Sequence, residues 1–331
     1  MTFPSVSIVI PLYNKAPYIA RALDSVLAQT IQDFEIIIVD GGSTDESLDI
    51  VAHYTDHRII CFLQEGKGVS TARNQGVKRA QAELIAFLDA DDEWLPEFLE
   101  TIFRLREKFS KASVYATSWY RYDSRKDIRI KKTWGIKEGW EGIVPSVFKC
   151  AALDGVFPGY TSSTTIQKSA FVAVGGFRTD ADMGEDLDLW GKLALCYSYA
   201  FSSQPLTIYH NTPNSLTKNP ELRITDTYPF QKSIMSYSPE WLSAKVNYDD
   251  LLLYLDSLNL STASNLIVSG EMKKARICLS NIQHGVLKER KMRLYLQTFI
   301  PLTLRSFIST VRKNCDIINF IYKYKMTFIN K

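Results

Sequence analysis

The chain has 331 residues, of which 46% are hydrophobic and 23% charged, so it can bury a sizeable core and is not intrinsically disordered. Its five cysteines are scattered without CxxC or zinc-type spacing, which argues against a disulfide framework and a zinc site. Because Met1–Pro11 also lacks a signal-peptide pattern, a reducing cytoplasm is the expected location. No apolar run approaches the roughly 18 to 20 residues that span a bilayer, so we expect no transmembrane helix.

The net charge of +3 is unevenly distributed along the chain. From Lys288 to Lys331 there are ten Lys or Arg residues and two acidic ones, which leaves the preceding residues with a net charge of −5. The body is therefore acidic and the tail is basic.

Strand and helix patterns alternate through the first 110 residues. Apolar runs predict four strands, and periodicity or capping signals predict a helix after each of the first three. The strands are Val6–Ile10, Phe34–Val39, Ile59–Leu63 and Leu84–Leu88, and the helices begin at Asn14 with Pro17, at a Ser43–Glu46 capping box, and over Val69–Ala80. This alternation predicts an α/β fold with a mostly parallel central sheet and helices on both faces.

Acidic residues follow two of the predicted strands. Asp40 follows the second strand, and Asp89, Asp91 and Asp92 follow the fourth. Because open sheets of this kind bind ligands outside the carboxyl ends of their strands, these carboxylates should line one crevice. Clustered carboxylates suit Mg²⁺ or Mn²⁺, which typically binds through one or two of them plus substrate phosphates. The alternative is a solvated acidic turn that caps a helix at Pro96.

Other motifs give no comparable signal. Gly66-Lys67-Gly68 lacks the third glycine of a dinucleotide fingerprint, and there is neither a Walker A sequence nor a G-x-S-x-G elbow. His53 and His57 are four residues apart but lack a nearby carboxylate motif, which favours a solvated helix edge over a metal site. We expect no nucleic-acid partner.

Several stretches, taken in order, resemble those of the family 2 glycosyltransferases with the GT-A fold. They are SIVIPLYNKAPYIARALDSVLAQT, FEIIIVDGGSTDESLDIV, GVSTARNQGV, ELIAFLDADDEWLP and GGFRTDADMGEDLDLWGKL, and the similarity fades in YHNTPNSLT. It covers residues 5 to 217. The resemblance implies an inverting transfer of a hexosyl or N-acetylhexosaminyl group from a nucleotide diphosphate sugar to an acceptor hydroxyl.

The resemblance also implies where the donor binds. The loop holding Pro11 and Tyr13, and the acid Asp40, would hold the base and ribose, with Gly41 in the same nucleotide site and Arg73 nearby. Asp89 and Asp91 match the family's DxD motif, with the first directed to the ribose and the second to a Mn²⁺ or Mg²⁺ ion that bridges the phosphates. A UDP-sugar is the expected donor.

Glu185 and Asp186 match the family's acidic pair near the acceptor, which supplies the general base. The chemistry requires such a group, because the acceptor hydroxyl must lose its proton as it attacks while a metal neutralises the departing diphosphate. Adjacent helical residues point about 100° apart, so one carboxylate of the pair faces the acceptor, and we expect it to be Asp186. The alternative is that the pair only compensates the dipole of a helix over Asp186–Leu195.

The chain departs from the family pattern at two positions. Gly41 stands where a second acid often contacts the base, and Thr212 stands where the family often has a histidine. His210 is the nearby histidine and could act as a phosphate or metal contact, or be an ordinary residue at a strand end.

The middle of the chain has two predicted strands, Ser113–Ser118 and Ile128–Trp134. Family resemblance places acceptor contacts in this half. Three aromatic residues could stack on a sugar or lie in the core: Tyr120, Trp134 and Trp140. With no Q-x-x-R-W signature, transfer of one sugar per encounter is expected.

The expected domains are 1–238 for the glycosyltransferase (1–110 for nucleotide-sugar binding and 111–238 for the acceptor) and 239–331 for a helical region with helices over Leu251–Leu260 and Ala275–Leu287. In the tail, apolar positions recur at helical spacing from Leu304 to Tyr322, which fits either a core helix or an interfacial helix on anionic lipid. The second reading would place the enzyme peripherally on the cytoplasmic face of the membrane, beside a lipid-linked glycan acceptor. Two alternatives from other classes remain: a non-catalytic nucleotide- or sugar-binding module, and a metal-dependent nucleotidyltransferase.

Overall fold

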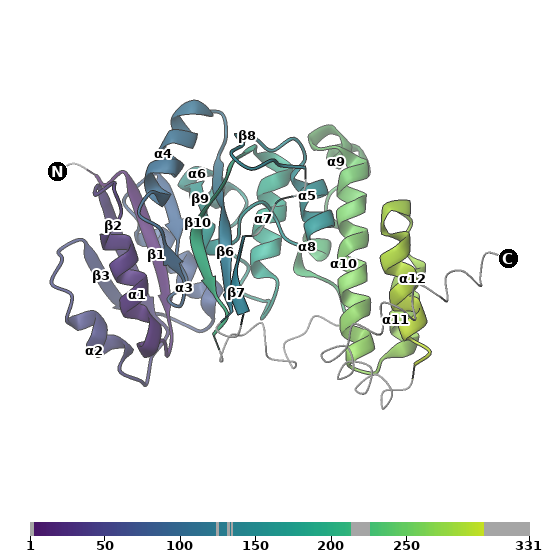
Figure 1. Ribbon diagram of the computed structural model, residues 1–331, viewed down its shortest axis with the longest axis horizontal. Helices are drawn as coiled ribbons and strands as arrows, with labels where there is room; N and C mark the ends of the chain where they lie inside the picture. Colours follow the sequence, from purple (N-terminus) through teal and green to yellow (C-terminus); the bar gives the residue numbers. More distant parts are fainter. Residues whose placement is uncertain (1–2, 124–125, 131–132, 134, 213–225, 301–331) are drawn as a thin grey trace. The chain divides into compact units, whose positions relative to one another are not determined.

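The computed structural model describes residues 3–123, 126–130, 133, 135–212 and 226–300. The chain divides into two compact units, Met1–Leu258 and Asn259–Lys331. The first unit contains a ten-stranded sheet with the order β3-β2-β1-β4-β9-β6-β10-β5, with β7 paired to β6 and β8 to β10 (Figure 1). This arrangement confirms the expected α/β fold with a mostly parallel central sheet.

The amino-terminal half supplies four parallel strands. They are β1 (Val6–Leu12), β2 (Phe34–Asp40), β3 (Ile59–Leu63) and β4 (Leu84–Phe87), and they alternate with α1 (Ala16–Leu27), α2 (Ser47–Ala52) and α3 (Val69–Arg79). In the register of β1 with β2, Leu12 lies opposite Asp40. Each of the four predicted strands is therefore present, within one or two residues of its expected ends.

The remaining strands make the sheet mixed. They are β5 (Glu93–Trp94), β6 (Val114–Asp123), β7 (Lys126–Ile130), β8 (Glu141–Ile143), β9 (Thr164–Gln167) and β10 (Tyr199–His210). Strand β9 runs antiparallel to both β4 and β6, and β10 then runs parallel to β6. Of the predicted strand Ile128–Trp134, only the first residues lie in β7, and Trp134 is outside the described residues.

Helices pack on both faces of the parallel strands, because side chains alternate sides along a strand. On one face, Ile8 and Ile10 of β1 share a core cluster with residues of α1 and of α4 (Phe98–Lys108). On the other face, Gly76 of α3 lies against Val9, where an added Cβ would be 2.3 Å from Val9 Cγ1. Full burial of an aliphatic side chain contributes roughly 1.5–3 kcal/mol, so this two-sided core fixes the strand ends that carry the site.

The other helices of the first unit follow from the middle of the chain onward. They are α5 (Val147–Asp154), the 3-10 turn η1 (Thr161–Ser163), α6 (Lys168–Ala173), α7 (Glu185–Cys196), α8 (Pro229–Ile234), α9 (Pro239–Lys245) and the start of α10 (Tyr248–Val268). In the second unit, α11 (Met272–Ser280) is followed by the turn η4 (Gly285–Leu287) and α12 (Lys288–Gln297). The expected single helix over Ala275–Leu287 is wrong, because α11 ends at Ser280 and a short turn separates it from α12.

The N-caps predicted for two of the helices are also wrong. Asn14 does not cap α1; it has a positive φ of 50°, and the N–H groups of Lys15 and Ala16 donate to Ser47 Oγ (2.9 Å) and Asp45 Oδ2 (3.0 Å). The Ser43–Glu46 box does not form, since α2 begins at Ser47 and Ser43 Oγ donates to Asp40 instead. The loop after β2 lies beside the end of β1, so its side chains reach the first turn of α1 and replace the local caps.

The expectation that no segment could cross a membrane was too strict. Helix α10 is 21 residues long with a mean hydropathy of 1.2 over its most apolar window, so by length and composition it could do so. However, 56% of that window is buried inside the protein, as in the core helix of a globular domain. The predicted amphipathic tail from Leu304 onward lies outside the described residues.

Candidate active site

The predicted donor residues gather at the carboxyl ends of three parallel strands. Because β1 pairs in parallel with both β2 and β4, the segments that follow them emerge at one edge of the sheet. These segments carry Pro11 and Tyr13, then Asp40, then the aspartates from Asp89 onward. These segments therefore share one edge of the sheet, where Tyr13 is exposed, at 59%.

Asp40 is buried and shapes the loop that follows it. Its carboxylate accepts the N–H groups of Gly42 (2.9 Å) and Ser43 (3.1 Å) and the Ser43 hydroxyl (2.6 Å). Gly42 has a φ of +86°, a conformation that side-chain-bearing residues rarely adopt. The carboxylate thus holds a tight turn at the end of β2, and its contact with a base or ribose stays a prediction.

Gly41 has room for a side chain with only small adjustments. Its N–H donates to the Leu12 carbonyl (2.7 Å), and an added Cβ would lie 3.3 Å from Gln64 Oε1 and 3.4 Å from Leu12 O. The second distance is an ordinary contact, and the first involves the end of a flexible side chain. The packing therefore does not explain why glycine stands where the family often has an acid.

The aspartates after β4 have three different environments. Asp89 accepts from Arg73 (2.7 Å). Asp91 Oδ2 accepts from Lys15 Nζ (2.5 Å) and from the Thr212 hydroxyl (3.0 Å). The side chain of Asp92 is buried, where it accepts the Ser162 hydroxyl (2.6 Å) and the His210 N–H (3.1 Å).

These contacts rule out the alternative of a solvated acidic turn at Pro96. Burial, followed by the nearby Asp89 charge, raises the pKa of Asp92 well above its ordinary value. Asp91 is only 16% exposed as a side chain, and α4 begins at Phe98 after Glu97. The repulsion between neighbouring aspartates is relieved by the cationic partners of Asp89 and Asp91 and by the hydrogen bonds that Asp92 accepts.

A divalent ion fits this donor set only together with a donor molecule. Within the described residues, no group of three or more His, Cys, Asp or Glu side chains could hold a metal by itself. Asp91, with the Thr212 hydroxyl beside it, offers the one or two oxygen ligands through which Mg²⁺ typically binds when substrate phosphates complete its shell. Thr212, the position where the family often has histidine, thus contacts the predicted metal ligand directly.

His210 is engaged elsewhere. Its Nε2 lies 3.1 Å from a Glu93 carboxylate oxygen, and its ring meets Tyr122 edge-on with centroids 5.4 Å apart. Burial lowers the pKa of the imidazole, with Arg21 acting in the same direction. A role of His210 toward a metal or phosphate stays a prediction.

Arg73 joins the two predicted acid clusters. Its guanidinium donates to Asp89 (2.7 Å) and to Glu185 (3.1 Å), and it lies 5.1 Å from the centre of the Phe177 ring. The residue is 4% exposed. Burial alone would lower its pKa, but Asp89 and Glu185 more than offset this and raise it. The structure therefore couples the aspartates after β4 to the acidic pair of α7 through one buried cation.

Glu185 and Asp186 occupy the first turn of α7 after Gly184, which caps the helix with a φ of 80°. Glu185 is directed to Arg73, whereas the Asp186 carboxylate accepts the neighbouring Leu187 N–H (2.8 Å). Burial, and then the Glu185 charge, raise the pKa of Asp186 to about 7. Glu185 is thus the partner of Arg73, whereas the raised pKa of Asp186 suits a general base near neutral pH, and that role of Asp186 stays a prediction.

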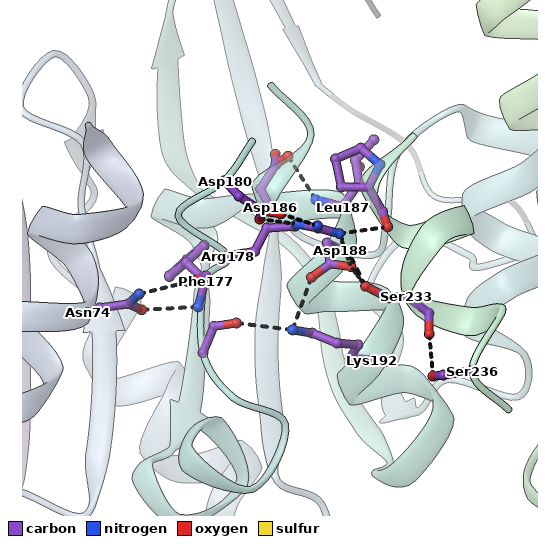
Figure 2. Close-up of polar contacts among 12 residues, drawn as sticks. Asn74, Phe177, Arg178, Asp180, Asp186, Leu187, Asp188, Lys192, Ser233 and Ser236 are labelled. Atoms are coloured by element: carbon purple, nitrogen blue, oxygen red, sulfur yellow. Dashed lines mark hydrogen bonds and ion pairs between the residues drawn. The ribbon is translucent and has the colours of Figure 1, made fainter. Parts of the chain in front are cut away.

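A further set of contacts holds the start of α7 from two sides (Figure 2). The Asn74 side-chain amide makes two hydrogen bonds with the Phe177 backbone (2.7 and 3.0 Å). On the other side, the buried Asp188 accepts the Ser233 hydroxyl of α8 (2.5 Å) and pairs with Lys192 (3.0 Å). Arg178 links the same region to α8 through the Pro229 carbonyl (3.1 Å).

Sequence reasoning missed these supporting residues. Lys15, Asn74, Asp188 and Ser233 lie outside any spacing rule that we applied, because their partners are distant in sequence. The signal that could have found Asp188 is a third acid near the start of a helix, placed between two leucines, since α7 buries Asp188 between Leu187 and Leu189.

The aromatic residues of the acceptor half have mixed environments. Tyr120 and Trp140 are partly buried, and Trp119, which is buried, packs against Tyr160 with centroids 5.1 Å apart. Separately, a hollow of about 590 Å³ lies at the amino-terminal edge of β2 and contains none of the predicted site residues. We therefore locate the candidate site from the functional groups of its residues and not from the volume of this hollow.

The glycosyl transferase family 2 model matches residues 7–171. An uncharacterised glycosyltransferase of Rickettsia typhi is 30% identical over 234 residues, which cover 68% of this chain and 69% of that protein. The chain belongs to glycosyl transferase family 2. It is therefore a glycosyltransferase, and the assignment of Asp89-Ala90-Asp91 to the family's DxD motif stays a prediction.

Other family 2 relatives align over shorter regions. Chondroitin synthase of Escherichia coli is 42% identical over 118 residues, which are 35% of this chain and 17% of that protein. The putative teichuronic acid biosynthesis glycosyltransferase TuaG of Bacillus subtilis is 44% identical over 100 residues, 29% of this chain and 40% of that protein. The chain thus spans less than half the length of these two relatives.

Solved structures share the fold. TarS of S. aureus in complex with UDP-GlcNAc superposes with a TM-score of 0.56 at 16% identity, over 88% of this chain and 89% of that one. The mannosyltransferase PcManGT of Pyrobaculum calidifontis, in complex with GDP-Man and Mn²⁺, gives a TM-score of 0.56 at 17% identity over 95% and 81%. These similarities show that the glycosyltransferase has the GT-A fold.

Proposed function

We propose that this glycosyltransferase moves a single sugar, with inversion, from a nucleotide diphosphate sugar to an acceptor hydroxyl. The observation that carries the proposal is Arg73, which joins Asp89 of the predicted DxD motif to Glu185 beside Asp186. One buried cation thus couples the donor-side and acceptor-side carboxylates. A nucleotide sugar and an acceptor bound at this edge of the sheet would meet between Asp89 on one side and Glu185 and Asp186 on the other.

In the proposed reaction, the acceptor oxygen forms a bond to the anomeric carbon while the bond from that carbon to the diphosphate oxygen breaks. Asp186 accepts the proton of the acceptor hydroxyl, and the electron pair of the broken bond leaves on the diphosphate. Attack from the face opposite to the leaving group inverts the anomeric configuration. Burial and the Glu185 charge raise the pKa of Asp186 to about 7, which suits a group that takes up a proton near neutral pH.

Asp91 would hold Mn²⁺ or Mg²⁺, with Asp89 beside it and the donor phosphates completing the shell. When bound, the ion neutralises charge on the leaving diphosphate. Lys15 must share Asp91 with the ion or move aside, because its ammonium contacts the same carboxylate oxygen that Thr212 does. The segments proposed to hold the base and ribose contain Pro11, Tyr13, Asp40 and Gly41.

The donor is proposed to be a UDP-sugar, and the acceptor a glycan or lipid-linked glycan in cell-surface polysaccharide or glycoconjugate assembly. The names of TuaG and chondroitin synthase support polysaccharide assembly, and the ligands named for TarS and PcManGT support a nucleotide sugar with a divalent metal. A lipid-linked acceptor would place the enzyme peripherally on the cytoplasmic face of the membrane.

The test is incubation with UDP-, GDP- and dTDP-sugars and Mn²⁺, with and without lipid-linked acceptors, followed by analysis of the released nucleotide. We expect nucleoside diphosphate to be released from one donor class, and Asp186→Asn to suppress acceptor-dependent release while the donor still binds. Donor binding without turnover would instead indicate a non-catalytic module. Release of pyrophosphate from a nucleoside triphosphate and a sugar phosphate would indicate a nucleotidyltransferase.

A further inference from the structure

An apolar stripe on α12 is exposed to solvent. Met292, Tyr295, Leu296 and Phe299 follow i, i+3, i+4 and i+7 spacing, so they share one face of the helix and its continuation. Their side chains are 52%, 40%, 55% and 58% exposed, and α12 itself contains no buried residue. In a globular protein, apolar residues with this spacing normally face the core. On α12 they face solvent instead.

Other apolar residues of the second unit are exposed as well. Ile277 of α11 is 62% exposed and Val286 of η4 is 68% exposed. Of the seventeen large hydrophobic residues that are exposed in the described part of the chain, seven lie between Val268 and Phe299. Such a concentration marks an interaction site more often than chance exposure.

The same segment is strongly basic. From Asn259 to Ile300 the sequence has seven cationic residues and two acidic ones, and the cations are Lys273, Lys274, Arg276, Lys288, Arg290, Lys291 and Arg293. The two acids are satisfied locally, since Glu271 pairs with Lys274 (3.5 Å) and Glu289 with Arg293 (3.4 Å). Lys288 and Arg290 are exposed on the first turn of α12.

Aromatic residues at the end of the stripe complete the pattern. The rings of Tyr295 and Phe299 meet edge-on with centroids 5.3 Å apart, and the Arg276 guanidinium lies 4.2 Å from the centre of the Phe299 ring. An amphipathic helix with exposed apolar and aromatic side chains beside Lys and Arg is typical of segments that lie in the interface of a membrane.

We propose that α12, through its apolar stripe and the cations beside it, binds an anionic lipid surface. Insertion of the α12 stripe would bury its apolar side chains, and each nearby cation adds an attraction to anionic headgroups. A second copy of the chain is a poorer occupant, because it would bring two basic faces together. The purpose of the contact, to bring the crevice to a lipid-linked acceptor, rests on the proposed function, whereas the binding itself does not.

The experiment measures sedimentation of the full-length chain with vesicles of phosphatidylglycerol and phosphatidylcholine, and with phosphatidylcholine vesicles alone. We expect binding to the first, weakened by raising salt from 50 to 500 mM, and little binding to the second. Lys288→Gln, which removes the cation four residues before Met292 on the same helix face, should lower the partition coefficient by about fivefold, the equivalent of about 1 kcal/mol. Met292→Gln with Leu296→Gln should lower it at least tenfold.

Matched controls use exposed residues on other elements. Val172→Gln with Met235→Gln removes the same kind of side chains at positions that are 65% and 81% exposed, and Lys78→Gln with Lys111→Gln removes two exposed cations. These variants should bind vesicles as the wild type does. Asp91→Ala should also bind normally, which separates lipid binding from sugar transfer.

Three results would overturn the proposal. The first is a wild-type chain that ignores anionic vesicles at 50 mM salt, and the second is binding that the two α12 variants leave unchanged. The third is light scattering that shows a dimer which Met292→Gln with Leu296→Gln converts to a monomer, since the stripe would then be an interface between copies.

Discussion

Replacing Arg73 with methionine removes a buried cation that pairs with two carboxylates. Methionine roughly conserves the unbranched stem, so the perturbation is the loss of the guanidinium and of its hydrogen bonds to Asp89 and Glu185. Removing one partner of a buried ion pair typically costs about 3–5 kcal/mol, because the remaining charge is left uncompensated. Of the two carboxylates, Glu185 is the more buried, with a side chain 13% exposed against 30% for Asp89.

The larger share of the cost should therefore come from Glu185. We expect Arg73→Met to lower the free energy of unfolding by about 3–5 kcal/mol. Glu185→Gln in the Arg73→Met background should recover part of this loss, giving a coupling energy of about 1–3 kcal/mol. Arg73→Lys should be intermediate, because an ammonium is a single point charge that cannot reproduce the guanidinium fork between two acids.

The assay is urea denaturation of the four variants of the cycle, followed by circular dichroism, with equal slopes against urea as the condition for comparing them. The matched control is Arg79→Met, which removes a cation on the same helix that stacks on Phe62 and is exposed. A loss below about 1 kcal/mol for Arg73→Met, the usual range of an exposed pair, or additive effects in the cycle, would refute the bridging role.

The remaining predictions concern the base, its pH dependence, the metal and the packing of α3. Asp186→Asn should lower kcat by about 10²–10⁴-fold with donor binding retained, measured by initial rates and calorimetry, and an inactive Glu185→Gln beside an active Asp186→Asn would reverse the assignment. Because the pKa of Asp186 is raised to about 7, kcat should rise with pH through that value. Because the pKa of Asp186 is higher in the folded than in the unfolded state, the folded state binds more protons at pH values between the two pKa values. The free energy of unfolding should therefore fall as pH rises toward 7, and Asp186→Asn should flatten that part of the profile. Asp91→Ala should abolish metal-dependent transfer, and wild-type turnover that persists in excess EDTA would contradict the metal role. Gly76→Ala should destabilise the fold by about 1–3 kcal/mol in urea titrations, since its Cβ would clash with Val9; an unchanged midpoint would show that α3 moves freely.

The inner strands of the parallel half, β1, β2 and β4, were predictable because they are buried on both faces and therefore read as continuous apolar runs. The run Phe34–Val39 is one example, and β2 is buried at all seven positions. By contrast, β9 has the sequence TTIQ, whose polar residues are buried by antiparallel neighbours on both sides. No local pattern distinguishes such a strand from a loop.

The residue types of the site were also predictable, but their partners were not. Asp89, Asp91, Glu185 and Asp186 stand out as acids after strands or at a helix start. The contact of Arg73 with Glu185 joins residues 112 positions apart, and that of Lys15 with Asp91 joins residues 76 apart. Such pairs are set by how the strands order in the sheet, which the sequence pattern does not specify.

Local capping rules failed for the same reason. Asn14 and the Ser43–Glu46 box satisfy the sequence preferences of helix starts, yet the N–H groups of Lys15 and Ala16 find Ser47 and Asp45 across the β1–β2 edge. A side chain that is distant in sequence but close in the fold can accept the N–H groups of the first helical turn in place of a local N-cap. The side chains of Asn14 and Ser43, which were expected to cap helices, then form hydrogen bonds in the neighbouring loops.

The most direct test of the central claim is the anomeric configuration of the product. With the donor that releases its nucleotide, Mn²⁺ and an acceptor, proton NMR of the first product formed should show the configuration opposite to that of the donor. Its rate of formation should fall by about 10²–10⁴-fold in Asp186→Asn. A product that retains the donor configuration, or one formed at the wild-type rate by Asp186→Asn, would contradict a direct displacement with Asp186 as the base.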